Sequence, residues 1–322
     1  MGLSKTVRTS ERLRAMGQYV HNRLVGRPTS ITIEVTKRCN ATCDFCPYWE
    51  ADEVEEVKDW TPAIRYFQPL HVSITGGEPL LRKDFIDVVR QIKDVPGFRY
   101  IVTYSNGWLL TEKNLEALTA AGANQIQVSL NYPDERQDAE RGIPGLWNKL
   151  STFLPAMAKR FDNLAIGTFL CADNLDCVVE LSKLVASWGI KHSFNSYSRL
   201  KNDNQTHLLT PAQIDKAREV VAQLVELKRQ RRHSLTSDQY LETIPTFFEE
   251  GQRSGCVAGD KFLYVDQQGY IKQCPELPPI GHISKLEEIE REPVSCGLCW
   301  YACRGEHQTK ITAKRVAELV LT

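Results

Sequence analysis

Apolar and polar positions follow two alternating patterns from residue 31 to about residue 195. Short apolar runs rich in β-branched and aromatic residues are typical of strands, and the stretches between them have apolar residues at helical spacing. Strand signals that alternate with helix signals predict a parallel sheet with helices outside it. The strand-like runs are 31–36, 71–75, 99–104, 125–130, 163–170 and 191–195, and the helix-like runs are 83–93, 111–121, 144–160 and 175–187.

The segment before this core has the pattern of an amphipathic helix. Residues 1–28 carry six Lys or Arg side chains and one acid, Glu11. The apolar positions at helical spacing are Val7, Leu13, Met16, Val20 and Leu24. We expect this stripe to pack on the floor of the barrel, and contact with a membrane surface or a partner is the alternative.

The chain after the core changes character near residue 200. Thr210-Pro211 has the composition of a helix N-cap followed by proline in the first turn, which predicts a long helix to about Arg232. A second helix is predicted over 237–250. The acidic stretch from Glu50 to Asp59 is read as a solvated loop of like charge with nothing to pair it.

Composition excludes several classes of protein. The chain has 322 residues with 42% hydrophobic content and a formal net charge of zero, so no global charge indicates a nucleic-acid partner. We find no secretory segment and no apolar run of membrane-spanning length, and we therefore expect a soluble cytoplasmic protein. Ten cysteines in such a chain indicate metal ligation in preference to disulfides.

Three of these cysteines, Cys39, Cys43 and Cys46, fall within eight residues just after the first strand-like run. Thiolates are the usual ligands of iron–sulfur clusters, and three of them can hold three corners of a cubane. The fourth iron would then stay open for chemistry. A zinc site is the alternative, but paired zinc knuckles usually follow each other within a few tens of residues, and here no second pair follows for well over a hundred.

A second motif, Gly76-Gly77-Glu78-Pro79, follows the strand-like run 71–75. Paired glycines let the backbone approach a ligand, and a glutamate can accept hydrogen bonds from an ammonium group. Together with Cys-x3-Cys-x2-Cys and Phe45 before the last cysteine, these residues resemble the radical S-adenosylmethionine (radical SAM) superfamily. The resemblance implies a partial (β/α)6 barrel, a [4Fe–4S] cluster that binds SAM, and function at the C-terminal ends of the strands.

By this resemblance, several residues at strand ends would contact SAM. They are Gly76, Gly77, Glu78, Pro79, Ser105, Asn106, Ser129 and Arg141. Arg141 lies in an Arg-Gly-x-x-Gly segment and, as a permanent cation, would approach the carboxylate of SAM. Each of these positions is equally compatible with ordinary turn chemistry. Asn131 departs from the aspartate often found there, and no role is assigned to it.

Cys171 lies at the end of the fifth predicted strand. A strand end in such a barrel faces the substrate, where a thiol could donate a hydrogen atom. The alternative is a buried structural cysteine, because free cysteine is among the most commonly buried residue types.

Five cysteines lie in the last seventy residues: Cys256, Cys274, Cys296, Cys299 and Cys303. The runs 262–265 and 270–273 flank Asp266 to Gly269, which predicts a hairpin bracketed by Cys256 and Cys274. The Gly-x4-Cys spacing of Gly269 and Cys274 resembles the twitch/SPASM extension of radical SAM enzymes. That resemblance implies one auxiliary [4Fe–4S] cluster on Cys256, Cys274, Cys296 and either Cys299 or Cys303. A zinc ribbon is the alternative.

The sequence thus predicts an α/β chain in four parts. They are an N-terminal helix (1–28), a partial barrel (29–200), a helical connector (201–250) and a small Cys-rich domain of hairpin and helix (251–322). We expect an enzyme that cleaves SAM to a 5′-deoxyadenosyl radical and oxidises a small metabolite or natural-product intermediate, with flavodoxin or ferredoxin as electron donor. The alternatives are a peptide-modifying or lipid-modifying radical SAM enzyme, and a non-catalytic iron–sulfur or zinc protein.

Overall fold

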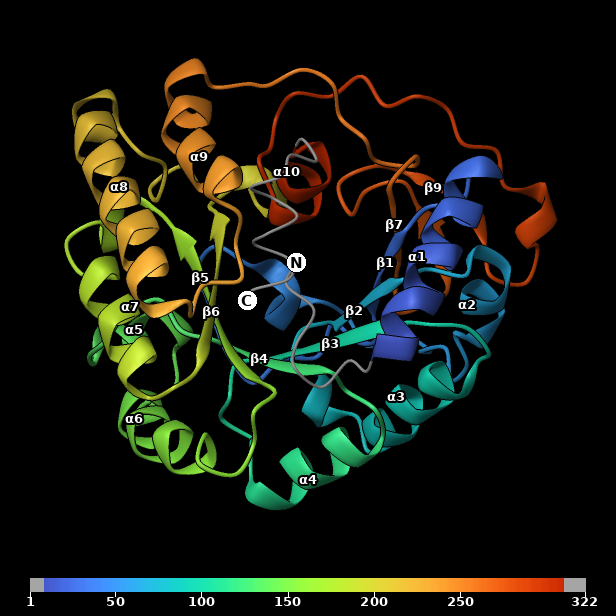
Figure 1. The fold of residues 1–322 in the computed structure, drawn as a ribbon, viewed down its shortest axis with the longest axis horizontal. Helices are drawn as coiled ribbons and strands as arrows, with labels where there is room; N and C mark the ends of the chain where they lie inside the picture. Colours follow the sequence, from blue (N-terminus) through green and yellow to red (C-terminus); the bar gives the residue numbers. More distant parts are fainter. Residues whose placement is uncertain (1–8, 310–322) are drawn as a thin grey trace.

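The structure is a computed structural model that describes residues 9–309. One sheet of nine strands runs through it in the order β6-β5-β4-β3-β2-β1-β7-β8-β9. The six predicted strands are confirmed and pair in parallel as neighbours, so they form the open barrel seen in Figure 1. The strands are β1 (Ser30–Glu34), β2 (His71–Thr75), β3 (Tyr100–Ser105), β4 (Gln125–Ser129), β5 (Leu164–Leu170), β6 (Lys191–Ser196), β7 (Phe262–Val265), β8 (Tyr270–Lys272) and β9 (Pro279–His282).

The helices cover the outside of the barrel, as Figure 1 shows for α3, α4, α6 and α7. The four predicted helix-like runs are confirmed, and α2 and α5 are two short helices that the pattern did not predict. The helices are α1 (Thr9–Leu24), α2 (Thr61–Phe67), α3 (Phe85–Asp94), α4 (Glu112–Ala120), α5 (Arg136–Arg141), α6 (Leu146–Met157), α7 (Val178–Ser187), α8 (Ile214–Arg231), α9 (Asp238–Glu250) and α10 (Ala302–Gln308). None of the helices in residues 9–309 is long and apolar enough to cross a membrane.

The predicted hairpin is confirmed as β7 and β8, which pair antiparallel. The Asp266 carboxylate accepts hydrogen bonds from the backbone amides of Gln268 and Tyr270, and Gly269 takes the positive φ of 87° that closes the turn. β7 also pairs in parallel with β1, so the C-terminal strands continue the barrel sheet.

Helix α10 bridges the two sides of the open barrel. At β6, the Asn195 side chain accepts a hydrogen bond from the amide of Ala302 at 2.8 Å, and the Ser196 hydroxyl donates to the carbonyl of Trp300 at 2.5 Å. At the other side, the ring of His307 lies 6.0 Å from that of Phe262 in β7. Figure 1 shows α10 in the space between these strands. The C-terminal cysteine segment therefore closes the side that the six-stranded sheet leaves open.

The expectation that α1 packs its apolar stripe on the barrel floor is wrong. The helix does lie on the floor, but Gln18 and Asn22 make the contact, through hydrogen bonds to the backbone of Gln68 and Phe98 just before β2 and β3. The floor presents backbone groups that need polar partners, so amide side chains pack there. The apolar stripe is exposed, and Val7 lies outside the described residues.

The sequence predicted that the acidic loop has no ion-pair partners, and this prediction is wrong. Glu56 forms ion pairs with Arg38 at 3.2 Å and with the buried Arg82 at 3.3 Å, and it accepts a hydrogen bond from the Thr36 hydroxyl. Arg82 also donates to the carbonyl of Val35. These contacts hold the loop against the end of β1.

The buried histidine His233 makes stability depend on pH. It contacts the Ser182 hydroxyl at 2.9 Å, and burial, with Lys191 and Arg231 nearby, lowers its pKa to about 4 from an ordinary 6.5. Between these two values the unfolded chain binds a proton that the folded chain does not. The stability is therefore full above pH 6.5 and is lost as the pH falls towards 4.

Lowering the pH from 7.5 to 5.5 should reduce the free energy of unfolding of the wild type. We expect this reduction to be about 1 kcal/mol smaller in His233→Gln. Urea unfolding followed by circular dichroism at the two pH values measures the difference. His21→Gln, at an exposed histidine of α1, is the control and should behave like the wild type. An unchanged pH dependence in His233→Gln would contradict the assignment.

Candidate active site

The cysteine loop 39–46 follows β1 at the C-terminal edge of the barrel sheet. Each of its three sulfurs has a nitrogen donor: the amide of Ala41 lies 3.4 Å from Cys39 Sγ, the Arg141 guanidinium 3.6 Å from Cys43 Sγ, and Lys201 Nζ 3.9 Å from Cys46 Sγ. Burial raises the pKa of the Cys39 thiol to about 11 and raises that of Cys43 as well. Two cations and an amide lie beside three thiols, of which that of Cys43 is buried and the other two are half-buried. Such donors fit a group that holds these thiols as thiolates, as an iron–sulfur cluster does.

The two glycines of the Gly-Gly-Glu-Pro motif serve a close approach between two backbone segments. The amide of Gly77 donates to the carbonyl of Thr36, and the amide of Glu78 donates to the carbonyl of Arg38, each at 2.8 Å. A Cβ on Gly76 would collide with the carbonyl oxygen of Thr36, and one on Gly77 with that of Arg38. The glycines therefore let the end of β2 pair with the start of the cysteine loop.

Glu78 joins the end of β2 to the end of β3. Its side chain is fully buried and accepts hydrogen bonds from the Ser105 hydroxyl at 3.0 Å, the Asn106 amide at 2.7 Å and the Leu80 amide at 3.2 Å. Burial raises its pKa to about 7, while these donors favour the ionised form. The expected contact of Glu78 with the ammonium group of SAM stays a prediction. In the structure, the contacts of Glu78 position the ends of β2 and β3 relative to each other.

Ser105 and Asn106 are likewise held by neighbours. The Ser105 oxygen accepts from the amide of Gly107, and the Asn106 side chain donates to the Asn40 side chain in the cysteine loop at 2.8 Å. Ser129 lines the barrel cavity. The expected contacts of these three residues with SAM remain predictions.

Arg141 is buried beside the cysteine loop and is fixed by Phe45, the aromatic of the cysteine motif, and by Glu140, which sequence reasoning missed. Its Nε lies 3.1 Å from the Glu140 carboxylate, and its guanidinium lies over the Phe45 ring at 5.4 Å. Asn131, to which no role was assigned, donates to both oxygens of Glu140 at 2.8 Å. An amide suits this position because it can donate to a carboxylate, which an aspartate there could not.

The loop that follows β6 packs over the cysteine loop. His207 contacts the Asp44 carboxylate at 2.9 Å and that of Asp173 at 2.5 Å, while Asn202 donates to the Asp44 carbonyl at 2.6 Å. Asp44 lies between the second and third cysteines of the motif, so this loop is held against the part of the cysteine loop that carries Cys43 and Cys46.

Cys256, Cys274, Cys299 and Cys303 lie in one electrostatic neighbourhood of the C-terminal segment. Burial raises the pKa of Cys303 well above its ordinary value, and the nearby thiols of Cys299, Cys274 and Cys256 raise it further. Burial likewise raises the pKa of Cys274 to about 12, with further contributions from Cys299 and Cys256. Electrostatic coupling of this kind requires the four sulfurs to lie near one another.

Arg304 holds this segment together, and no sequence pattern identified it beforehand. Its side chain is fully buried and donates to the carbonyls of Cys299 at 2.9 Å and Ser254 at 3.0 Å, and also to that of Arg253. It thereby ties the cysteine knuckle to the residues just before Cys256. No signal marked it because its partners are backbone carbonyls distant in sequence.

Among residues 9–309, no three His, Cys, Asp or Glu side chains converge tightly enough to ligate a single metal ion. A cubane places each thiolate on a different iron, so its cysteine sulfurs lie further apart than the ligands of one zinc ion.

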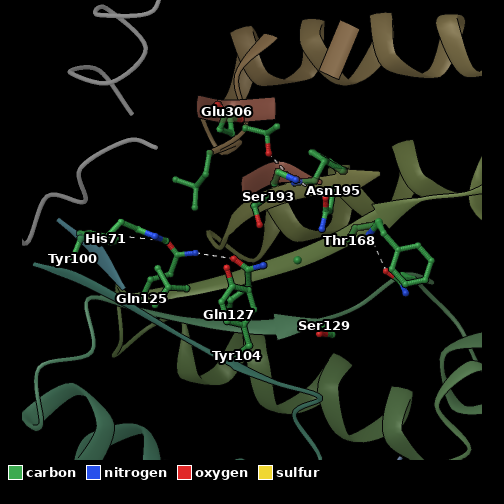
Figure 2. A pocket seen from close by; sticks show the side chains of 18 of the residues that line it. His71, Tyr100, Tyr104, Gln125, Gln127, Ser129, Thr168, Ser193, Asn195 and Glu306 are labelled. Carbon is green, nitrogen blue, oxygen red and sulfur yellow. Dashed lines mark hydrogen bonds between the residues drawn. The ribbon is translucent and has the colours of Figure 1, made fainter. Parts of the chain in front are cut away.

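The barrel encloses a cavity of about 250 Å³ whose wall is mostly amide, hydroxyl and aromatic side chains (Figure 2). Arg141 lies at the end next to the cysteine loop, and Ala302 and Glu306 of α10 form part of the wall. The lining residues labelled in Figure 2 are His71, Tyr100, Tyr104, Gln125, Gln127, Ser129, Thr168, Ser193, Asn195 and Glu306. The cavity therefore reaches from the first cysteine site to the helix that carries Cys303.

Cys171 is not brought to this cavity. It is buried at 1% exposure, its amide donates to the side chain of Asn174, and it is absent from the cavity lining. Burial raises the pKa of its thiol far above the ordinary value. This position matches the structural alternative better than a role in hydrogen donation.

Comparison with known proteins agrees with this site. Residues 33–185 match the family model described as Radical SAM superfamily. The chain is 25% identical to the AdoMet-dependent heme synthase of Methanosarcina barkeri, over 88% of this chain and 92% of that one. It is 35% identical to the GTP 3′,8-cyclase of Limosilactobacillus fermentum over only 37% of that protein.

Among solved structures, SuiB of Streptococcus suis has a TM-score of 0.62 at 19% identity, covering 85% of this chain and 67% of SuiB. That likeness concerns the fold. The matched model spans both sequence motifs, and residues 33–185 of this chain belong to the radical SAM superfamily. The protein is an enzyme, and the alternative of a non-catalytic carrier or scaffold is set aside.

Replacing Gly77 tests the pairing of the two motifs. We expect Gly77→Ala to lower the free energy of unfolding by about 1–3 kcal/mol, because the new methyl group meets backbone that cannot move freely. Iron bound after anaerobic reconstitution should fall with it. Urea unfolding and an iron assay measure both effects.

The matched control is Gly17→Ala, at an exposed helical glycine with nothing within 4 Å of the added carbon. It should be neutral or stabilise by about 0.5–1 kcal/mol. A Gly77→Ala protein as stable and as rich in iron as this control would contradict the packing argument.

Proposed function

We propose that this enzyme binds a [4Fe–4S] cluster on Cys39, Cys43 and Cys46, cleaves SAM reductively, and removes a hydrogen atom from a small molecule held in the barrel cavity. A second [4Fe–4S] cluster on the C-terminal cysteines would take part in a net oxidation. The observation that carries the proposal is the cavity itself, because one end meets Arg141 beside Cys43 and its wall includes the helix of Cys303.

The chain's own residues bind, orient and exclude water. The bound cluster would supply one electron to SAM, whose C5′–S bond then breaks to give methionine and a 5′-deoxyadenosyl radical. Arg141, fixed by Glu140 and Phe45, offers a cation at the cavity end. The loop containing His207 covers the cysteine loop, and such exclusion of water protects reactive intermediates.

The cavity wall supports a compact, uncharged substrate that carries hydroxyl or amide groups. Gln125 and Gln127 are hydrogen-bonded to each other at 2.9 Å, and Ser129, Thr168 and Ser193 add hydroxyl groups. The lining histidine, His71, is neutral because burial lowers its pKa to about 3. Glu306 also lies in the wall, where its carboxylate accepts a hydrogen bond from the amide of Ser237 at 2.9 Å, so an anionic substrate would meet a carboxylate there. The amide and hydroxyl groups of the wall satisfy a neutral polar molecule.

The ligand set that we propose for the second cluster is Cys256, Cys274, Cys299 and Cys303. The mutual coupling of these four thiols and the anchoring of the segment by Arg304 support it. This assignment uses both Cys299 and Cys303 and leaves Cys296 outside the set, in place of the set with Cys296 that the spacing suggested. Cys303 lies on α10, whose Ala302 and Glu306 line the cavity, so a cluster held by this set would supply its redox chemistry from that wall.

The similarity to heme synthases over most of both chains favours a second candidate, a reaction on a heme precursor. A tetrapyrrole is large and carries several carboxylates. The cavity is about 250 Å³, and its lining combines the carboxylate of Glu306 with one arginine, Arg141, which would already serve SAM. A Soret titration with a porphyrin tests this candidate, and tight stoichiometric binding would favour it over the neutral substrate.

We expect the reconstituted wild type to hold about eight irons per chain and Cys274→Ala about four. Cys274→Ala should still form 5′-deoxyadenosine from SAM and dithionite, whereas Cys43→Ala should not. Anaerobic iron and sulfide assays with chromatography of the nucleoside products measure these outcomes.

Cys296→Ser is the matched control, from the same knuckle as Cys299, and it should keep about eight irons. Four irons in this variant would return Cys296 to the ligand set. Four irons together with zinc in the wild type would contradict the second cluster while leaving the SAM chemistry in place.

A further inference from the structure

The outward face of α1 is apolar over most of its length. Leu13, Met16, Val20 and Leu24 follow one another at intervals of three or four residues and are exposed by 67%, 66%, 56% and 81%. Residues at this spacing lie on one side of a helix. The stripe from Leu13 to Leu24 is about 16 Å long, at 1.5 Å per residue. Side chains of this size are rarely left in water as a continuous row.

The opposite face of α1 fixes this orientation. Ala15 and Asn22 are buried, and the Gln18 amide donates to the carbonyl of Phe98 and accepts from its backbone amide at 2.8 Å. Asn22 donates to the carbonyl of Gln68 at 2.7 Å. The helix cannot rotate its apolar stripe inward without breaking these bonds. The stripe is therefore a built surface feature of the barrel floor.

The charge around the apolar stripe of α1 indicates what kind of partner binds there. Residues 1–28 contain six basic side chains and one acid. Arg23 is paired with Asp260 at 3.1 Å, whereas the exposed Arg14 flanks the stripe. A second copy of this chain would bring basic side chains against basic side chains. The segment 310–322 would likewise bring positive charge to a basic helix, because it has Lys310, Lys314 and Arg315 and a single acid. An apolar layer bordered by negative charge complements both features.

We propose that α1 docks the enzyme on an anionic phospholipid surface, with the stripe at the acyl boundary and the basic side chains among the headgroups. The barrel floor then faces the membrane. The cysteine loop lies at the other end of the strands and stays open to an electron donor. The cavity residues His71 and Tyr100, at the starts of β2 and β3, lie at the membrane end of the barrel.

Co-sedimentation of the reconstituted enzyme with vesicles tests this surface. We expect binding to phosphatidylcholine vesicles that contain about a third phosphatidylglycerol, and little binding to pure phosphatidylcholine. Binding should weaken as salt rises from about 0.1 to 0.5 M, because the electrostatic part is screened. The double variant Val20→Ser, Leu24→Ser should lower the apparent affinity about tenfold or more, since two apolar side chains leave the interface.

Val54→Ser is the matched control, an exposed valine in the acidic loop, and it should bind vesicles like the wild type. The iron content and 5′-deoxyadenosine formation of all variants in solution should be unchanged, so failure here is distinct from failure of the proposed reaction. The proposal is overturned if the wild type does not bind, or if the double variant binds as well as the wild type. Hydrogen exchange of the enzyme without vesicles tests two other occupants of the stripe. Protection of the α1 amides by a second copy of the chain, or by residues 310–322, would also overturn the proposal.

Discussion

The buried carboxylate of Glu78 is the contact on which the rest of the site depends. It accepts hydrogen bonds from groups that follow β2 and end β3. The backbone amide of Glu78 donates to the carbonyl of Arg38, just before the cysteine loop. Removing such a group would leave three donors unsatisfied in the interior. One residue therefore fixes both places: its backbone amide holds the start of the cysteine loop, and its side chain holds the end of the third strand. The glycines before it are needed because the segments touch backbone to backbone.

A second constraint acts over a long distance in sequence. The open barrel needs a wall between β6 and β7, and α10 supplies it through Asn195 on one side and His307 near Phe262 on the other. Arg304 then holds the cysteine knuckle against the residues before Cys256. The same segment therefore closes the barrel and brings the C-terminal cysteines together. This coupling explains why the cavity reaches both cysteine groups.

The strands, most helices, both cysteine groups and the superfamily could be predicted because each has a local signal in spacing or periodicity. The roles of Asn131, Glu140 and Arg304 could not, because their partners are distant in sequence and include backbone atoms. The orientation of α1 was predicted wrongly for a related reason. Periodicity identifies an apolar face, but the floor of this barrel presents backbone groups, and these select Gln18 and Asn22.

The central claim is that one cavity lies between two iron–sulfur sites. An anaerobic crystal structure with data collected at the iron edge tests it directly. The account predicts two anomalous peaks, one beside Cys39, Cys43 and Cys46 and one among Cys256, Cys274, Cys299 and Cys303, with the barrel cavity between them. A single iron peak, or a second peak held by Cys296 and separated from the cavity by α10, would contradict it.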